Sequence, residues 1–389
     1  MPDDPPPLIR ALLDPARYPQ PVATVELLET HISWVLLAGD RAYKIKKPVT
    51  LPFLDYGTLD KRQACCEAEL RLNRRYAPEL YLDVVAITGT PDAPLLGGTG
   101  TAIEYAVGMR RFAEAARLDH LASRDELTPA HMSLLAAEIA DFHDRAAVAA
   151  ADTRFGTPEQ TLAPVLENFA ELARLMPAET DRRRLAGLAA WTRHEFKQRR
   201  AAFAARKQAG RVRECHGDLH LGNLALIDGR VVPFDCIEFN EDFRWNDVVS
   251  EIAFVWIDLL DHRQPGLAAW LLNAWLELSG DFEALAVLRF YAVYRAVVRA
   301  KVATLRARQE GARQGLAELD SARAYLQLAW QTALPPAPAL IITCGLSGSG
   351  KTTASSACLL DPTAAPAGGT LRLRSDVERK RLFGLAPQD

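Results

Sequence analysis

The residue types best suited to chemistry lie in the stretch His216–Asn223 (HGDLHLGN) and at Asp235, twelve residues further on. One carboxylate can accept the proton of a hydroxyl group and align the attacking oxygen. An amide oxygen and a second carboxylate can hold Mg²⁺ against nucleotide phosphates. The spacing therefore favours Asp218 as the base of a phosphoryl transfer, with Asn223 and Asp235 as metal ligands. A polar turn without catalytic function is the alternative.

A basic strand provides candidates for binding phosphate. In the segment AYKIK, strand side chains alternate, so that Ala42, Lys44 and Lys46 share one face. A kinase lysine lies two residues after a small residue of the adenine pocket, which favours Lys44 as the ligand of the α- and β-phosphates, with Lys46 as second choice. A carboxylate on the following helix would orient this lysine, and Glu67 and Glu69 are both candidates. An exposed basic strand and a solvated helix face are the alternatives.

A second motif, GLSGSGKT at residues 345–352, has the pattern G-x-x-x-x-G-K-[ST]. It follows the apolar segment Leu340–Cys344, predicted as a strand, and precedes a predicted helix, which is the usual context of a P-loop. Glycines there let backbone amides surround phosphates, while the lysine neutralises them and the threonine can bind Mg²⁺. The expected nucleotide and metal ligands are Gly345, Gly348, Gly350, Lys351 and Thr352.

The surrounding sequence predicts the elements that position these motifs. Alternating or apolar β-branched residues predict strands at 22–28, 33–38, 41–47, 82–88 and 101–109, interrupted by a helix over 58–76. Helices are expected from residue 118, with starts at Thr128-Pro129, near 158 and near 181, and again from Asn246 to Gln331. We therefore divide the chain into a loose Pro-rich segment (1–20), a β-rich lobe (21–111), an α-rich lobe (112–332), a Pro-rich linker (333–339) and a partial P-loop domain (340–389).

Composition excludes several classes of protein. The chain has 389 residues, 49% of them hydrophobic, with a net charge of −3. These values predict two or three packed domains and argue against disorder or a global nucleic-acid binder. No signal peptide or apolar stretch long enough to span a membrane is evident. The six cysteines form no C-x-x-C pair, so we expect free thiols and a cytoplasmic protein.

The HGDxxxxN loop followed by an apolar strand and Asp235 resembles the aminoglycoside phosphotransferase family of protein-kinase-like small-molecule kinases. The resemblance covers roughly residues 20–330, and it extends to bacterial members fused to a C-terminal P-loop kinase-like domain. It implies an α+β, bilobal protein-kinase-like fold, use of ATP and Mg²⁺, and a small polar phosphoryl acceptor. It favours Glu69, in ELRLNR, over Glu67, and it implies that Asp247 caps a helix and braces the catalytic loop.

The chain also departs from the familiar kinase pattern. No G-x-G-x-x-G lies between the first two strands, and Asp235 is followed by Cys236-Ile237-Glu238 rather than Phe-Gly. Glu238 could be an additional carboxylate on the metal or substrate side. The segment LRLRSDVER resembles the second strand and helix of P-loop kinases similar to gluconate kinase, which implies Asp376 and Arg379 as acceptor-facing residues. A capping role for Asp376 is equally open.

Three functions remain to be compared. The first is transfer of the ATP γ-phosphoryl group to a small molecule, with no nucleic-acid or membrane partner. The second is a nucleotide-binding regulatory protein, in which the kinase-like cleft is weakly active or inactive and the chemistry resides in the P-loop unit. That unit has only about fifty residues, without a Walker B carboxylate or lid, so we expect a fragment or no independent kinase activity. The third is aminoglycoside phosphorylation, which would need an acidic pocket from residues such as Glu238, Glu241, Asp242 and Asp258.

Overall fold

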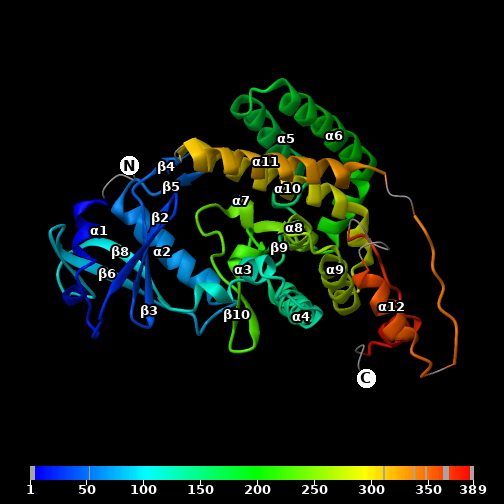
Figure 1. The fold of residues 1–389 in the computed structure, drawn as a ribbon, viewed down its shortest axis with the longest axis horizontal. Coiled ribbons are helices and arrows are strands. Elements are labelled where there is room, and N and C mark those ends of the chain that lie inside the picture. The colour runs from blue at the N-terminus through cyan, green and yellow to red at the C-terminus, as the bar shows by residue number, and fades with distance from the viewer. Residues whose placement is uncertain are drawn as a thin grey trace. The chain divides into compact units, whose positions relative to one another are not determined.

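The computed structural model describes residues 5–51, 53–309, 312–335, 338–346, 348–361 and 368–385. The chain divides into two compact units. The first consists of Met1–Arg117 with Asn223–Phe243, and the second of Leu118–Gly222 with Arg244–Asp389. The segment 223–243 therefore packs with the N-terminal sheet, although in the sequence it lies within the predicted α-rich lobe. Figure 1 shows the elements of both units.

The first unit is built on a six-stranded antiparallel sheet with the order β1-β2-β3-β8-β6-β7. Its strands are β1 (Val25–Glu29), β2 (Ser33–Ala38), β3 (Arg41–Lys46), β6 (Tyr81–Thr90), β7 (Ala93–Leu96) and β8 (Ala102–Arg110). The five predicted strands are confirmed to within a few residues, and β7 is the strand that the prediction lacked. Helix α2 (Leu59–Asn73) packs against β8 and β6. It begins as predicted, because the Thr58 hydroxyl accepts a hydrogen bond from the Lys61 N–H.

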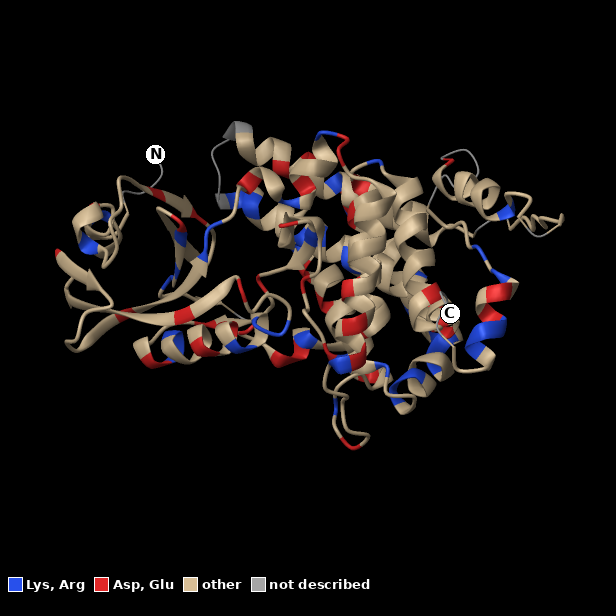
Figure 2. Ribbon diagram, turned by 90° about the horizontal axis from the view of Figure 1, so that it is seen from below, with Lys and Arg blue, Asp and Glu red and all other residues tan. Residues whose placement is uncertain are grey.

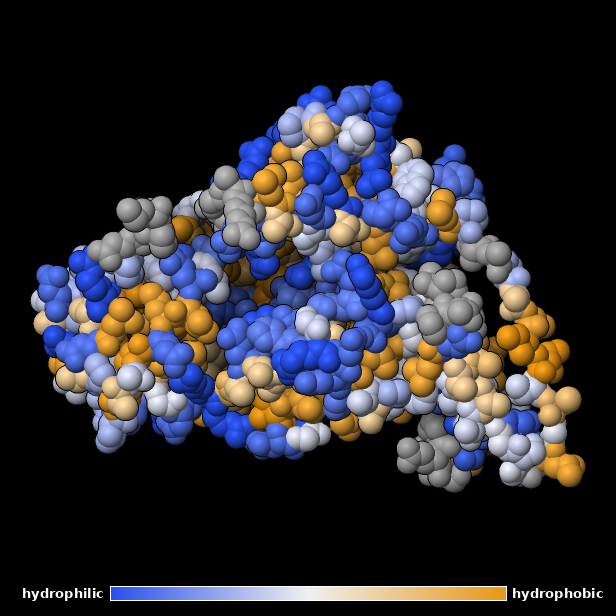
Figure 3. Space-filling model, in the orientation of Figure 1, coloured by the Kyte–Doolittle hydropathy of each residue, from blue (hydrophilic) through white to orange (hydrophobic). Residues whose placement is uncertain are grey.

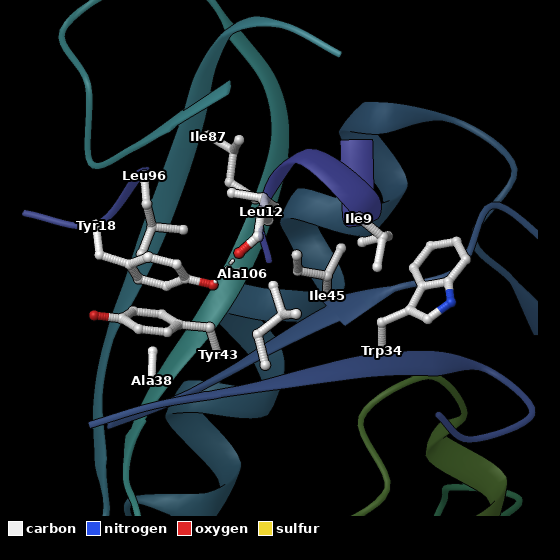
Figure 4. Packing of buried hydrophobic residues seen from close by; sticks show 11 residues of the cluster. Ile9, Leu12, Tyr18, Trp34, Ala38, Tyr43, Ile45, Ile87, Leu96 and Ala106 are labelled. Atoms are coloured by element: carbon white, nitrogen blue, oxygen red, sulfur yellow. Dashed lines mark hydrogen bonds between the residues drawn. The ribbon is translucent and has the colours of Figure 1, made fainter. Parts of the chain in front are cut away.

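The N-terminal segment packs against the six-stranded sheet and adds apolar side chains to its core. Helix α1 (Pro7–Ala11) and the 3₁₀ turn η1 (Pro15–Arg17) place Ile9 and Leu12 in a hydrophobic cluster with Trp34 and Tyr43 (Figure 4). Tyr18 donates a hydrogen bond to the Leu12 carbonyl, 2.9 Å away. The prediction that the first twenty residues are loose is therefore wrong for residues 5–20. Their apolar side chains cover the sheet, and burial of that area outweighs the Pro-rich composition.

Short antiparallel pairs complete the first unit. They are β4 (Thr50–Leu51) with β5 (Leu54–Asp55), and β10 (Leu224–Ile227) with β11 (Arg230–Pro233). The 3₁₀ turn η2 (Glu114–Ala116) also belongs to this unit, and η3 (Leu221–Asn223) lies where the chain passes from the second unit back to the first. Loops and short strands are what the sequence predicts for residues 211–239.

The second unit is helical. Its first helices are α3 (Leu118–Ser123), α4 (Pro129–Arg145), α5 (Pro158–Leu175) and α6 (Glu179–Gln208). The strands β9 (Val212–Glu214) and β12 (Trp245–Asp247) pair with each other. The later elements of this unit are α8 (Val248–Asp261), α9 (Pro265–Ser279), η4 (Phe282–Ala284), α10 (Leu285–Gln309) and α11 (Ala312–Ala333). The short helix α7 (Glu241–Arg244) lies where the chain passes from the first unit to the second. Helices α10 and α11 run side by side (Figure 1). Acidic and basic residues are interspersed along the helices (Figure 2), and some of them form exposed pairs such as Arg183–Glu179.

The C-terminal part contains α12 (Lys351–Leu360) and α13 (Ser375–Leu382). The predicted strand Leu340–Cys344 is not formed. Its apolar side chains are exposed, Leu340 to 87% and Ile342 to 79% (Figure 3). A strand requires a neighbour for its N–H and C=O groups, and no described strand pairs with this segment. Among the described residues, no helix combines the length and apolarity needed to cross a membrane.

Candidate active site

An ion pair in the first unit connects strand β3 with helix α2. The Lys44 Nζ donates to Glu69 Oε1 at 2.9 Å and also contacts the carboxylate of Asp235. Glu69 has no exposed surface, whereas the Asp235 side chain is 43% exposed. Glu67 lies on the exposed side of α2 and accepts a hydrogen bond from Gln63. The structure thus brings Lys44, Glu69 and Asp235 together and leaves Glu67 apart from them.

Lys46 occupies the buried side of the same cluster. Its Nζ donates to Glu69 Oε2 at 2.6 Å, contacts Glu238, and lies 3.3 Å from the Tyr56 hydroxyl. That hydroxyl also donates to Glu238. The Lys46 side chain has no exposed surface, and that of Glu238 is 4% exposed. Both groups therefore face protein rather than solvent.

Mutual attraction sets the charges in this cluster. Burial by itself would lower the pKa of Lys44, but the carboxylates of Asp235 and Glu69 hold it well above its usual value. The same balance raises the pKa of Lys46, through Glu238 and Glu69. Burial would raise the pKa of Glu69, yet the two lysines lower it to about 2. Lys44, Lys46 and Glu69 are therefore charged at neutral pH.

The backbone around Asp235 is fixed by polar side chains of the first unit. The Asp235 N–H donates to the Tyr81 hydroxyl at 2.9 Å, and the Cys236 N–H donates to Asn73 Oδ1 at 2.8 Å. Asp235 has a φ of 63°, a left-handed conformation that costs energy in a non-glycine residue. These two hydrogen bonds hold it there. The carbonyl of Asn223 accepts from the Phe234 N–H at 3.0 Å, which connects the two expected metal ligands through the backbone.

In the second unit, helix α8 holds the loop that carries Asp218. Glu251 Oε1 accepts hydrogen bonds from the N–H groups of His216 and Gly217, at 2.7 and 2.8 Å. Two helical turns further along, Asp258 Oδ2 accepts from the Leu221 N–H at 2.9 Å. Both carboxylates are buried, and the cost of burying them is offset by these bonds.

This bracing role of Glu251 and Asp258 was not among the expectations from the sequence. Glu251 and Asp258 are seven positions apart on one face of a largely apolar helix, which is the signal that could have revealed them. Glu251 Oε2 also pairs with His143 Nε2 at 3.0 Å. With Cys215, these residues form a group close enough to hold a metal ion. Because both Glu251 oxygens already accept hydrogen bonds, the group serves to fix the loop.

Asp218 has a histidine beside it. The Gly222 N–H donates to His220 Nδ1 at 3.0 Å, which assigns the proton of a neutral ring to Nε2. This Nε2 lies 3.5 Å from Asp218 Oδ2. Burial would raise the pKa of Asp218, but His220 and then Arg299 lower it below its usual value. The carboxylate is thus ionised, and its side chain is 36% exposed.

Asp247 has the capping role that the resemblance implies, since its carboxylate accepts from the Val249 N–H at the start of α8. Its expected role in bracing the loop falls instead to Glu251. The Asp247 carboxylate pairs with the Arg206 guanidinium, which also binds Asp281. All three side chains are nearly fully buried.

The acidic pocket considered for aminoglycosides loses two of its members. Asp258 accepts from the Tyr325 hydroxyl at 2.9 Å, lies 3.6 Å from Arg299, and is 1% exposed. Glu238 is neutralised by Lys46. Neither carboxylate is available to a cationic acceptor.

The P-loop motif leads into a helix, as predicted, and this helix, α12, begins at Lys351. The Lys351 Nζ donates to the carbonyls of Gly345 and Leu346, at 2.8 and 2.6 Å. Thr352 is exposed in the first turn. The turn residues Gly348 and Gly350 have φ values of 77° and 81°, which favour glycine.

The residues proposed to face an acceptor in this unit lie at the start of α13. Asp376 accepts a hydrogen bond from Arg374 at 2.9 Å, and this bond lowers its pKa. An acidic residue in the first turn is also favoured by the helix dipole. Arg379 lies on the same helix. The capping role that the sequence left open for Asp376 is not observed, because Arg374 occupies the N-cap position and no side chain caps the helix; Asp376 lies in the first turn instead.

Comparison with known proteins agrees with this architecture. The family model described as "AAA domain" matches residues 340–389. An uncharacterized protein of Mycobacterium tuberculosis is 31% identical over 336 residues, covering 85% of this chain and 64% of that protein. The chain thus spans 64% of the length of the curated relatives that it matches.

Among solved structures, choline kinase from Cryptosporidium parvum is similar with a TM-score of 0.50 at 9% identity, covering 83% of this chain and 94% of that one. Aminoglycoside 2′-phosphotransferase-IIIa gives a TM-score of 0.46 at 13% identity, covering 79% and 93%. The similarity to the choline kinase structure, together with the observed topology, gives the chain a protein-kinase-like fold with a β-rich and an α-rich part, and AAA-domain sequence follows it.

Proposed function

We propose that this chain is an ATP- and Mg²⁺-dependent phosphotransferase that acts on a hydroxyl or amine group of a small polar molecule. The observation that carries this proposal is the contact of Lys44 with both Glu69 and Asp235. A lysine for the nucleotide phosphates, the carboxylate that orients it and a carboxylate for metal are thereby joined in one cluster. The kinase-like fold supports the same conclusion, because solved structures with this fold include a choline kinase.

Each residue has a definite role in this proposal. Lys44 binds the α- and β-phosphates, and Glu69 fixes its position. Asp235 and Asn223 provide oxygen ligands of the kind that Mg²⁺ prefers; when bound, the ion would neutralise charge on the phosphates. The ionised Asp218 accepts the proton of the acceptor group as its oxygen or nitrogen bonds to the γ-phosphorus and the bond to ADP breaks. His220 and the amide-bound Glu251 keep Asp218 in place.

A second candidate function is nucleotide-dependent regulation through the P-loop unit. It is favoured by the AAA-domain match over residues 340–389 and by the intact GLSGSGKT motif. In this alternative, Lys351 would leave the carbonyls of Gly345 and Leu346 to bind nucleotide phosphates, and Thr352 would face the metal. The Lys44 cluster would then bind nucleotide without rapid turnover.

The test is acceptor-dependent ATP turnover with Mg²⁺ by the wild type, Asp218→Asn and Lys351→Ala, against sugars, amino sugars, amino alcohols, nucleosides and aminoglycosides. We expect Asp218→Asn to lose about 10²–10⁴-fold in kcat while it still binds ATP, and Lys351→Ala to retain turnover. Loss in Lys351→Ala alone would assign the chemistry to the P-loop unit. Binding of ATP without turnover on any acceptor would favour the regulatory alternative.

A further inference from the structure

The charged groups of the first unit form a closed circuit. Asp235 contacts Lys44, Lys44 contacts Glu69, Glu69 contacts Lys46, and Lys46 contacts Glu238. Three peptide bonds connect Glu238 back to Asp235. We call these five side chains the lysine–carboxylate ring. It joins strand β3, helix α2 and the segment 235–238.

Lys46 has no bonding capacity to spare for a nucleotide. An ammonium group has three donors, and Lys46 has three partners, namely Glu69, Glu238 and the Tyr56 hydroxyl. Its side chain is also fully buried. Lys44, by contrast, shares its ammonium group between Glu69 and the partly exposed Asp235. The two lysines therefore have different tasks, although they lie two residues apart on one strand face.

In the proposed function, nucleotide binding would change the partners of one half of the ring only. When Lys44 binds phosphate and Asp235 binds metal, the contact between them is replaced. Glu69 Oε2 and Glu238 still share Lys46, so helix α2 and the segment 235–238 keep a common anchor. Because Glu238 is three residues from Asp235, this anchor limits how far the metal-binding carboxylate can move.

The geometry points to Lys46 and Glu238 as positioning residues, which hold Glu69 and the segment 235–238 in place while Lys44 exchanges Asp235 for nucleotide phosphates. This inference rests on the proposed function. It assigns Lys46 and Glu238 to the support of the metal and phosphate ligands, and to neither nucleotide nor substrate. We therefore expect the Mg²⁺ concentration needed for nucleotide binding to rise when Lys46 and Glu238 are replaced.

A double variant separates positioning from simple stability. Lys46→Met leaves the buried Glu238 without its cation, which is strongly destabilising, whereas removal of both charges is much better tolerated. The double variant Lys46→Met/Glu238→Gln removes one positive and one negative charge, so the net charge of the ring stays as in the wild type. We expect its melting temperature to recover most of what Lys46→Met loses.

The measurement is calorimetric binding of ADP at increasing MgCl₂, with all variants in a Lys351→Ala background so that the P-loop does not contribute. We expect the half-saturating Mg²⁺ concentration to rise about tenfold in Glu238→Gln and in the double variant, as loss of a supporting contact to a metal ligand commonly produces. Tyr56→Phe, which removes only one hydroxyl, should give a smaller rise at near-wild-type stability. Lys47→Met is the matched control, because the adjacent Lys47 pairs with the half-exposed Glu29 outside the ring.

Each outcome decides the question. A double variant with recovered stability and wild-type Mg²⁺ dependence would overturn the positioning role and leave a structural one. If Lys46→Met weakened metal-free ADP binding while Glu238→Gln did not, Lys46 would be a phosphate ligand and the inference would be wrong. Should the double variant fail to fold, Tyr56→Phe with unchanged Mg²⁺ dependence would count against it equally. Absence of any ADP binding by the Lys351→Ala background would instead refute the proposed function, and this inference with it.

Discussion

Lys44 and Glu69 form a buried ion pair at 2.9 Å although 25 residues separate them in the chain. The pair exists because helix α2 packs against the sheet that contains β3. Glu69 lies in the interior of the first unit, where Lys46 binds its second carboxylate oxygen, Oε2. The correct docking of α2 is therefore a condition for the phosphate-binding lysine to be held in place.

The first prediction concerns the two glutamates of α2. Glu69→Gln removes the carboxylate that the buried Lys44 and Lys46 share. We therefore expect a loss of ~3–5 kcal/mol in the free energy of unfolding and a higher KM for ATP. Glu67→Gln, on the exposed side of the same helix, should change stability by no more than about 0.5 kcal/mol. Urea unfolding of both variants checks this. Equal effects would show that Glu69 has no special role.

The second prediction is a pH dependence of stability through Glu251. Burial would raise its pKa, but the hydrogen bond and charge of His143, together with the amide of Gly217, lower it. A carboxyl with a depressed pKa in the folded state stabilises above its unfolded pKa of about 4.3, and this stabilisation is lost as the pH falls through the folded value. Wild type should therefore exceed Glu251→Gln in unfolding free energy by ~1.5–3 kcal/mol at pH 7.

This difference should shrink below about pH 4. Urea unfolding of both proteins over a series from about pH 7 down to about pH 3 provides the measurement. A difference that grows on acidification would contradict a lowered pKa of Glu251 in the folded protein. Because Glu251 bonds the loop of Asp218, the kcat of Glu251→Gln should fall at neutral pH as well.

The third prediction concerns the buried Arg206. Its guanidinium makes paired contacts with Asp247 and Asp281, at 2.6 to 2.8 Å. Lysine cannot reproduce this planar, multidentate geometry, so Arg206→Lys should cost ~2–4 kcal/mol of unfolding free energy. Arg200→Lys, on an exposed part of the same helix, should cost under about 1 kcal/mol. Thermal unfolding of the two variants measures both losses. An Arg206→Lys variant as stable as the wild type would show that the guanidinium contacts with Asp247 and Asp281 are not needed for stability.

The fourth prediction tests the contact of the C-terminal segment with helix α9. Asn273 Nδ2 donates to the Thr370 carbonyl at 2.7 Å, and the Arg372 N–H donates to Asn273 Oδ1 at 2.6 Å. Loss of both bonds, at ~1 kcal/mol each, should increase the undocked population about 5- to 30-fold. Asn273→Ala should therefore accelerate tryptic cleavage within residues 372–381 to that extent.

Ser133→Ala is the control for this experiment. The Ser133 hydroxyl accepts a hydrogen bond from Trp270, which lies on α9 like Asn273, but Ser133 makes none of the bonds that hold Thr370 and Arg372. Mass spectrometry of the fragments locates the cleavage sites. Identical cleavage rates in Asn273→Ala and wild type would show that these hydrogen bonds do not hold the segment.

Local sequence patterns accounted for most elements. The helix start at Thr128 followed from an N-cap residue before a proline, the helix over 58–76 followed from its apolar positions, and the strand β2 agreed residue for residue with its prediction. The strand predicted at Leu340–Cys344 failed, although its residues have strong β-propensity. A strand depends on a partner from elsewhere in the chain, whereas a helix satisfies most of its hydrogen bonds internally.

The sequence by itself determined which residue types are available and where the short-range elements begin. It placed Lys44 and Lys46 on one strand face and put Asp218 in a loop. Only the tertiary structure decided the partner of each charge, since Lys46 meets Glu238 across 192 residues and the loop amide of His216 meets Glu251 across 35. These contacts depend on how sheet and helices pack, and packing is a property of the whole fold that no local spacing encodes.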